Sequence, residues 1–188
     1  MGGKNLKKVG TVSSEGGPLL VVEATIARSW RGADNDDYER ACEILSTEPM
    51  AEARLISIAN GEGLIWDMGG PGISDVFLKS STHLVVVRTW IDDPDDTQTI
   101  AVFANAPLQK HQSLGSLVFK TGIATILWAP ESGEGIAPTN FGDSISIEGL
   151  SVGGSGLLVK LEPGNYRCLH DEISGEFGEA RRLHLITS

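Results

Sequence analysis

The sequence is poor in cysteine and has more acidic than basic side chains. Its two cysteines, Cys42 and Cys168, lie far apart and outside any C-x-x-C spacing, which excludes the common zinc and redox motifs. The chain carries 25 Asp and Glu against 15 Lys and Arg, a net charge of -10. Because binding to nucleic acid requires a basic face, we expect no nucleic-acid partner. An acidic surface instead suits a basic protein partner.

Long hydrophobic runs are also missing. No apolar stretch approaches the roughly 20 residues that span a bilayer. The opening residues, MGGKNLKKVG, contain no apolar block typical of a secretion signal. We therefore expect no membrane contact and a cytoplasmic location. Hydrophobic residues make up 40% of the 188 residues and charged residues 21%, so the chain should fold alone around a sizeable core.

Motifs for catalysis and metal binding are absent from the sequence as well. No G-x-S-x-G elbow, H-E-x-x-H motif or phosphate-binding G-x-x-x-x-G-K-[ST] loop occurs. The run His170-Asp171-Glu172 alternates between the two faces of a predicted strand, so its three side chains cannot converge on one ion. We expect no catalytic residue, no metal and no cofactor. An enzyme that uses His170, Asp171, Glu172 or His184 remains an alternative. A cleft that holds at least two of these residues within hydrogen-bond reach would support it.

What the sequence does contain is a succession of short alternating or β-branched segments separated by glycine-rich turns. Pro163-Gly164, between two of these segments, favours a hairpin. The protein is therefore predicted to be mostly β, as a sandwich or as small barrels. The predicted strands are residues 8–12, 19–23, 54–59, 64–66, 76–79, 84–91, 116–120, 123–128, 144–147, 156–161, 165–170 and 182–186.

One short helix is predicted over residues 36–45, where Asp36 and Glu39 fit a capping box and apolar residues recur at helical spacing. Residues 97–105 are ambiguous, because their apolar residues fit a helix while their threonines and Val102 favour a strand. We predict a strand there.

A polar connector follows, around residues 106–115, and we place a subdomain boundary at its start. The fold class predicted is thus two packed β-rich subdomains, residues 1–105 and residues 106–188. Each contains a glycine turn followed by an apolar strand, so a relation between the two halves is an open alternative.

Two segments combine aromatic residues, arginine and acids, the types enriched at binding surfaces. The first begins at Trp30 and the second at Arg88. The ordinary interpretations are a buried tryptophan beside a helix cap and a solvated acidic turn. The candidate partner-binding residues are Trp30, Arg31, Asp34, Asp36, Asp37, Tyr38, Arg88, Trp90, Asp92, Asp93, Asp95 and Asp96.

Several motifs follow one another in a characteristic order from about Val9 to Trp90. They are Ser14, Gly16-Gly17-Pro18-Leu19, Trp30-Arg31-Gly32, Asp37-Tyr38 with Arg40-Ala41-Cys42, Gly63-Leu64-Ile65 to Gly70-Pro71, and Arg88 with Trp90. This ordered set resembles the immunity protein 21 family of bacterial polymorphic toxin systems. The resemblance implies a non-enzymatic protein that binds and neutralises a cognate toxin. If that toxin is basic, the acidic clusters would speed encounter and the aromatic residues would hold the complex.

A second hypothesis is an all-β module that binds a small ligand such as a saccharide through exposed tryptophans. The sequence offers Trp30, Trp66, Trp90 and Trp128 for this role. Exposure of one or more of them in a concave groove would favour the hypothesis, and burial of all four would count against it.

Overall fold

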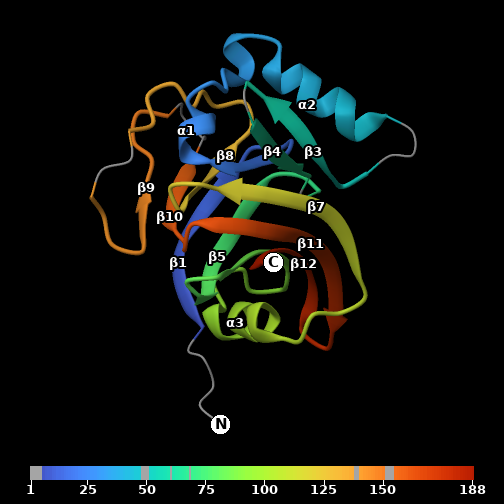
Figure 1. Ribbon diagram of the computed structural model, residues 1–188. Coiled ribbons are helices and arrows are strands. Elements are labelled where there is room, and N and C mark those ends of the chain that lie inside the picture. Colours follow the sequence, from blue (N-terminus) through green and yellow to red (C-terminus); the bar gives the residue numbers. More distant parts are fainter. Residues whose placement is uncertain (1–5, 48–50, 60, 68, 138–139, 151–154) are drawn as a thin grey trace.

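Two six-stranded antiparallel sheets pack against each other and form most of the protein (Figure 1). The computed structural model describes residues 6–47, 51–59, 61–67, 69–137, 140–150 and 155–188. The prediction of a mostly β protein is confirmed, and the sandwich is the architecture observed.

The strand order differs from the chain order in both sheets. Sheet A runs β1 (Lys7–Ser14), β5 (Gly72–Ser80), β6 (His83–Trp90), β12 (Gly178–Thr187), β11 (Gly164–Gly175) and β7 (His111–Phe119). Sheet B runs β3 (Ala53–Ile58), β4 (Gly61–Trp66), β2 (Leu19–Glu23), β8 (Ile123–Trp128), β10 (Gly156–Lys160) and β9 (Ser144–Ser146). Each of the twelve strands predicted from alternating or β-branched segments overlaps one of these. The hairpin predicted at Pro163-Gly164 is wrong, since this turn carries the chain from sheet B to sheet A.

Three apolar layers hold the sheets and helices together. One lies between the sheets and joins Val21 and Leu64 of sheet B to Val86 and Leu183 of sheet A. A second covers the outer face of sheet B, beneath α1 (Ala24–Ala27) and α2 (Asp37–Ser46). The third lies on the outer face of sheet A, beneath α3 (Thr97–Asn105). None of the helices in the described part of the chain has the length and apolar character that a membrane crossing requires.

The strand predicted over residues 97–105 is wrong, because this segment is α3. The carboxylate of Asp96 accepts hydrogen bonds from the amides of Gln98 and Thr99, both at 3.0 Å, and so caps the helix. Ile100 and Phe103 recur at helical spacing and are buried against sheet A. A capped apolar face therefore outweighs the β propensity of the threonines.

The predicted boundary near residue 105 does not separate the two sheets. Each sheet contains strands from both sides of that position. The layer between the sheets likewise contains residues from both halves, including Val12 and Leu157. The division into residues 1–105 and residues 106–188 therefore corresponds to no layer of this fold. The structure also contains α1 and α3 besides α2, the one helix predicted.

Candidate functional site

At one end of sheet A, the face that lines the core continues to the protein surface. Val86 and Leu183 pair across β6 and β12 and are fully buried between the sheets. Two residues further toward this end, on the same side, lie Arg88 and Arg181, which also pair with each other. Trp90 follows on the same side of β6 and is 38% exposed. The sheet thus presents a large aromatic ring where its core face meets solvent.

Two arginines hold the exposed ring of Trp90. The guanidinium carbons of Arg88 and Arg181 each lie 5.4 Å from the ring centroid. At this distance a guanidinium is attracted to the negative face of an indole. Arg88 is itself fixed, because it donates to the carbonyl of Ile73 at 3.0 Å and to that of Pro71. Trp90 is therefore an oriented aromatic residue, the kind that loses little conformational entropy when a partner binds.

The turn between β11 and β12 completes a surface around Trp90. A shallow depression of about 310 Å³ lies between this turn and the end of β6. Phe177, at the tip of the turn, is 62% exposed. We call this region the Trp90 surface. Its residues are Trp90, Ile91, Asp92, Glu176, Phe177 and Glu179. Two exposed aromatic rings among carboxylates suit a partner that is apolar at its centre and basic around it.

The structure brings together only part of the second predicted cluster. Trp90 and Asp92 belong to the Trp90 surface, and Arg88 supports it from beneath. Asp93 and Asp95 are exposed in the following turn. Asp96, in contrast, is the N-cap of α3.

Sequence reasoning missed Glu176, Phe177 and Glu179, which lie far from Trp90 in the chain. The pairing of β12 with β6 brings them close to Trp90, since Glu179 lies directly opposite Trp90 in this register. The one available signal was a large apolar residue between Gly175 and Gly178, at a turn where solvent exposure is expected.

In the first predicted cluster, Trp30 is not a surface residue. It is fully buried, and its indole Nε1 donates to the carbonyl of Ala129 at 2.8 Å. Its ring fills the layer between sheet B and the helices that cover this sheet, so in this structure it presents no surface to a partner. Beside it, Arg31 forms an ion pair of 2.7 Å with Glu134.

The rest of this cluster shapes the start of α2. Asp36 occupies the N-cap but makes no side-chain capping bond, so the predicted capping box does not form. The carboxylate of Asp37 accepts from the amide of Arg31 and pairs with Arg40, both at 2.9 Å. Tyr38 is half-buried, while Asp34 and Asp36 are exposed. Asp34 and Asp36 are therefore the exposed acids of this cluster that a partner could contact directly.

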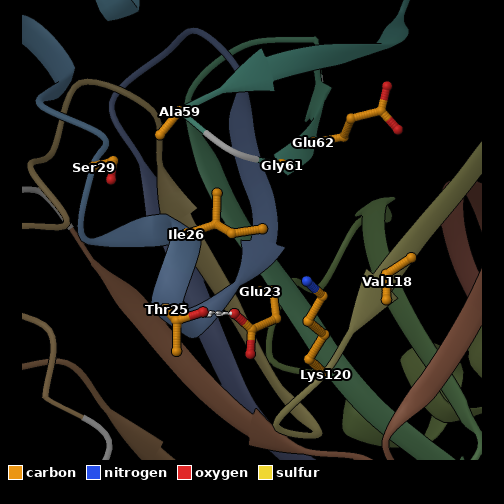
Figure 2. A pocket seen from close by; sticks show the side chains of 9 residues that line it. All are labelled: Glu23, Thr25, Ile26, Ser29, Ala59, Gly61, Glu62, Val118 and Lys120. Carbon is orange, nitrogen blue, oxygen red and sulfur yellow. Dashed lines mark hydrogen bonds between the residues drawn. The ribbon is translucent and has the colours of Figure 1, made fainter.

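A separate cavity of about 440 Å³ lies beside α1 and the ends of β3 and β7 (Figure 2). Glu23 lines it, but the carboxylate of Glu23 already has partners within the protein. It accepts from the amides of Thr25 at 2.9 Å and Thr121 at 3.3 Å, and from both threonine hydroxyls. Burial raises the pKa of Glu23, yet these hydrogen bonds outweigh it, so the pKa lies below the ordinary 4.5. Glu23 thus joins the start of α1 to the turn between β7 and β8.

This lowered pKa predicts a pH-dependent contribution of Glu23 to stability. A group with a depressed folded-state pKa stabilises the protein above its unfolded pKa, and the contribution is lost as pH falls through the folded value. Glu23→Gln should therefore lower the free energy of unfolding at pH 7, and the difference from wild type should shrink below pH 4.5. Urea unfolding between pH 7 and pH 3 measures it. Glu62→Gln, on the exposed rim of the same cavity, is the control, and a Glu23→Gln effect that stays constant across the range would contradict the prediction.

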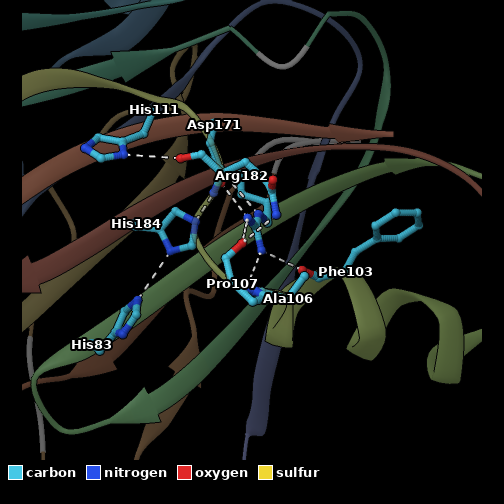
Figure 3. Close-up of polar contacts among 9 residues, drawn as sticks. His83, Phe103, Ala106, Pro107, His111, Asp171, Arg182 and His184 are labelled. Carbon is cyan, nitrogen blue, oxygen red and sulfur yellow. Dashed lines mark hydrogen bonds and ion pairs between the residues drawn. The ribbon is translucent and has the colours of Figure 1, made fainter. Parts of the chain in front are cut away.

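A buried polar network lies on the other side of sheet A, at the C-terminal end of α3 (Figure 3). Arg182 is fully buried and pairs with Asp171, with 2.8 Å between Nε and Oδ1. Its guanidinium also donates to the carbonyls of Phe103, Ala106 and Pro107, at 2.8, 2.8 and 2.9 Å. His184 Nε2 lies 3.2 Å from the Asp171 carboxylate. Burial raises the pKa of Asp171, but hydrogen bonds from His184 and Arg182 outweigh burial and hold that pKa well below its usual range.

Asp171 and His184 lie within hydrogen-bond reach of each other, as the enzyme alternative requires. They do not lie in an open cleft, however. Asp171 is 2% exposed and His184 is 1% exposed, so a substrate cannot reach them. The network fastens α3 to sheet A.

The sequence was compared with models of known protein families, with curated proteins and with solved structures. The family model of Immunity protein 21 matches residues 11–176. The chain belongs to the immunity protein 21 family. No curated protein and no solved structure matches it.

The match to the immunity protein 21 family reaches well beyond the resemblance seen from Val9 to Trp90. It covers most of the chain and includes strands of both sheets on both sides of residue 105. This agrees with the interleaved strand order, in which neither half of the chain forms a sheet alone. The second half, up to residue 176, is therefore part of the region that the family model matches.

Proposed function

We propose that this protein is a non-enzymatic immunity protein that acts in the cytoplasm by binding and neutralising a cognate toxin. The observation that carries the proposal is family membership over residues 11–176. The net charge of -10 supports a basic partner, because opposite charges accelerate encounter and the effect weakens with added salt.

The Trp90 surface is the contact region that we propose. Phe177 and Trp90 supply exposed apolar area, and Asp92, Glu176 and Glu179 place carboxylates around it. A partner that buries both rings would bring lysine or arginine side chains onto these carboxylates. The aromatic residues would then slow dissociation, while the carboxylates and the neighbouring Asp93 and Asp95 would raise the association rate.

The test is capture of the partner by the protein in lysate of its host. Tagged protein is incubated at low salt, and the proteins that elute as salt is raised are identified by mass spectrometry. We expect one basic protein. Trp90→Ala should weaken its binding by roughly 30-fold, the effect of losing about 2 kcal/mol at a hot spot. The affinities of wild type and variant for the purified partner give this ratio.

Two control variants locate the contact. Val102→Ala removes an exposed apolar side chain from α3, away from the Trp90 surface, and should leave binding unchanged. Reversal of Asp34 and Asp36 to lysine changes charge in the other predicted cluster, and it should weaken binding less than reversal of Asp92, Glu176 and Glu179. Equal loss from both reversals would contradict the proposed contact region. Capture of no specific protein would contradict the proposed function and favour a small ligand.

A further inference from the structure

Three side chains that ligate metals meet beside the Trp90 surface. His170 and Glu172 lie on one face of β11, and Asp171 points to the opposite face, as strand alternation requires. The third side chain is Glu52, which immediately precedes β3 in the chain. Glu52, His170 and Glu172 each offer one ligand atom, and these atoms lie within 4.8 Å of one another.

The imidazole of His170 is the unusual member of this cluster. It is 5% exposed and packs edge-on to Trp66, with 6.3 Å between the ring centroids. Its Nδ1 lies 3.5 Å from Oε2 of Glu52, whereas its buried Nε2 has no hydrogen-bond partner among the described residues. A metal binds the neutral form of an imidazole, through the lone pair of one ring nitrogen.

Neither neutral tautomer of His170 suits these surroundings. With the proton on Nδ1, the buried lone pair of Nε2 lacks a donor, which is unfavourable. With the proton on Nε2, this buried N–H lacks an acceptor and the lone pair of Nδ1 faces the lone pairs of a carboxylate oxygen. A cation held between His170 and Glu52 removes the conflict at Nδ1, because it accepts electron density from both atoms.

Arg181 is the cation that already contacts the two carboxylates. Its Nη2 lies 3.0 Å from Oε1 of Glu52, and its Nε lies 3.0 Å from Oε1 of Glu172. Oε2 of Glu52 faces His170 instead. Arg181 also rests against the ring of Trp90, so it retains one favourable contact if a metal displaces it from the carboxylates.

We propose that Glu52, His170 and Glu172 form a binding site for a divalent transition-metal ion, with Zn²⁺ as the best match. Zinc accepts both imidazole nitrogen and carboxylate oxygen as ligands, and three protein ligands leave a fourth position for water. Tetrahedral ligands at zinc distances lie roughly 3.4 Å apart, so a contraction of at most roughly 1.4 Å from the observed spread of 4.8 Å suffices. Glu52 also lines a groove of about 640 Å³ between β3 and β7, through which the ion can enter.

Titration calorimetry of the full, tag-free chain with Zn²⁺ alone tests the site. We expect one ion bound per chain. Glu172→Gln should weaken binding at least about tenfold, since it removes one ligand charge, and His170→Ala should do the same. Arg181→Gln should strengthen binding, because it removes the competing cation. This last result is one that a purely structural role of the cluster would not produce.

His111→Ala is the matched control, since His111 is an exposed histidine outside the cluster. It should leave Zn²⁺ affinity unchanged. The side chain of Glu172 is 58% exposed, so Glu172→Gln is expected to fold normally even if His170→Ala does not, and urea unfolding checks each variant. Absence of saturable binding to wild type, or equal affinity in wild type and Glu172→Gln, would overturn the proposal. The test needs no toxin, so its outcome is separate from that of the proposed function.

Discussion

Arg182→Met is expected to lower the free energy of unfolding by about 3–5 kcal/mol, the typical effect of removing one partner of a buried ion pair. The substitution leaves the Asp171 carboxylate buried without its main counter-charge. It also removes the donor to three carbonyl groups at the end of α3. Methionine fills much of the same volume, so the loss comes mainly from the unpaired polar groups.

Urea unfolding at neutral pH gives the change in stability, and hydrogen exchange shows where it acts. We expect the amides of α3 to lose protection, because Arg182 links its C-terminal end to sheet A. Arg167→Met, on an exposed position of β11, is the matched control and should change stability by less than about 0.5 kcal/mol. Similar effects at the two positions would show that the network does not stabilise the fold.

Trp30→Ala is expected to destabilise the protein by about 3–5 kcal/mol, as large-to-small substitutions of buried aromatic residues do. Trp30 is fully buried beneath the helices that cover sheet B, and its indole N–H donates to the carbonyl oxygen of Ala129. Alanine would leave a cavity there and an unpaired carbonyl. The same substitution at Trp90 should have a much smaller effect on stability, because that ring is partly exposed.

Comparing these two variants separates a core role from a binding role. Thermal or urea unfolding should show a large loss for Trp30→Ala and a small one for Trp90→Ala. Partner binding should show the reverse order for Trp30→Phe and Trp90→Ala, since phenylalanine keeps most of the core volume. Loss of binding in a stably folded Trp30→Phe variant would contradict our placement of the contact region.

The strands could be predicted from the sequence because each carries its own signal. The predicted strands Leu19–Glu23, which begins with four apolar residues, and Ile123–Trp128 match β2 and β8 at both ends. Their pairing with each other could not be predicted, since it depends on contacts between residues about a hundred positions apart. For the same reason, the interleaving of the two halves was missed, and sequential subdomains were predicted instead.

Local signals also misled where two of them conflicted. Residues 97–105 have β-branched side chains, but the cap by Asp96 and an apolar face toward Phe77 and Val85 make them a helix. At the site, Arg88, Trp90 and Asp92 lie in one continuous segment and were predicted. Phe177 and Glu52 were not, because only the register of sheet A and the packing of the two sheets bring them near Trp90 and His170.

The position of β12 has a consequence for the time at which the protein can act. This strand lies between β6 and β11 in sheet A, so the sheet stays divided until residue 187 has been synthesised. Arg181 and Glu179 arrive with it, and so do Arg182 and the anchoring of α3. Long-range pairing of this kind also slows folding. Under the proposed function, a toxin made at the same time would meet no complete partner during that interval, so synthesis of this protein should begin first.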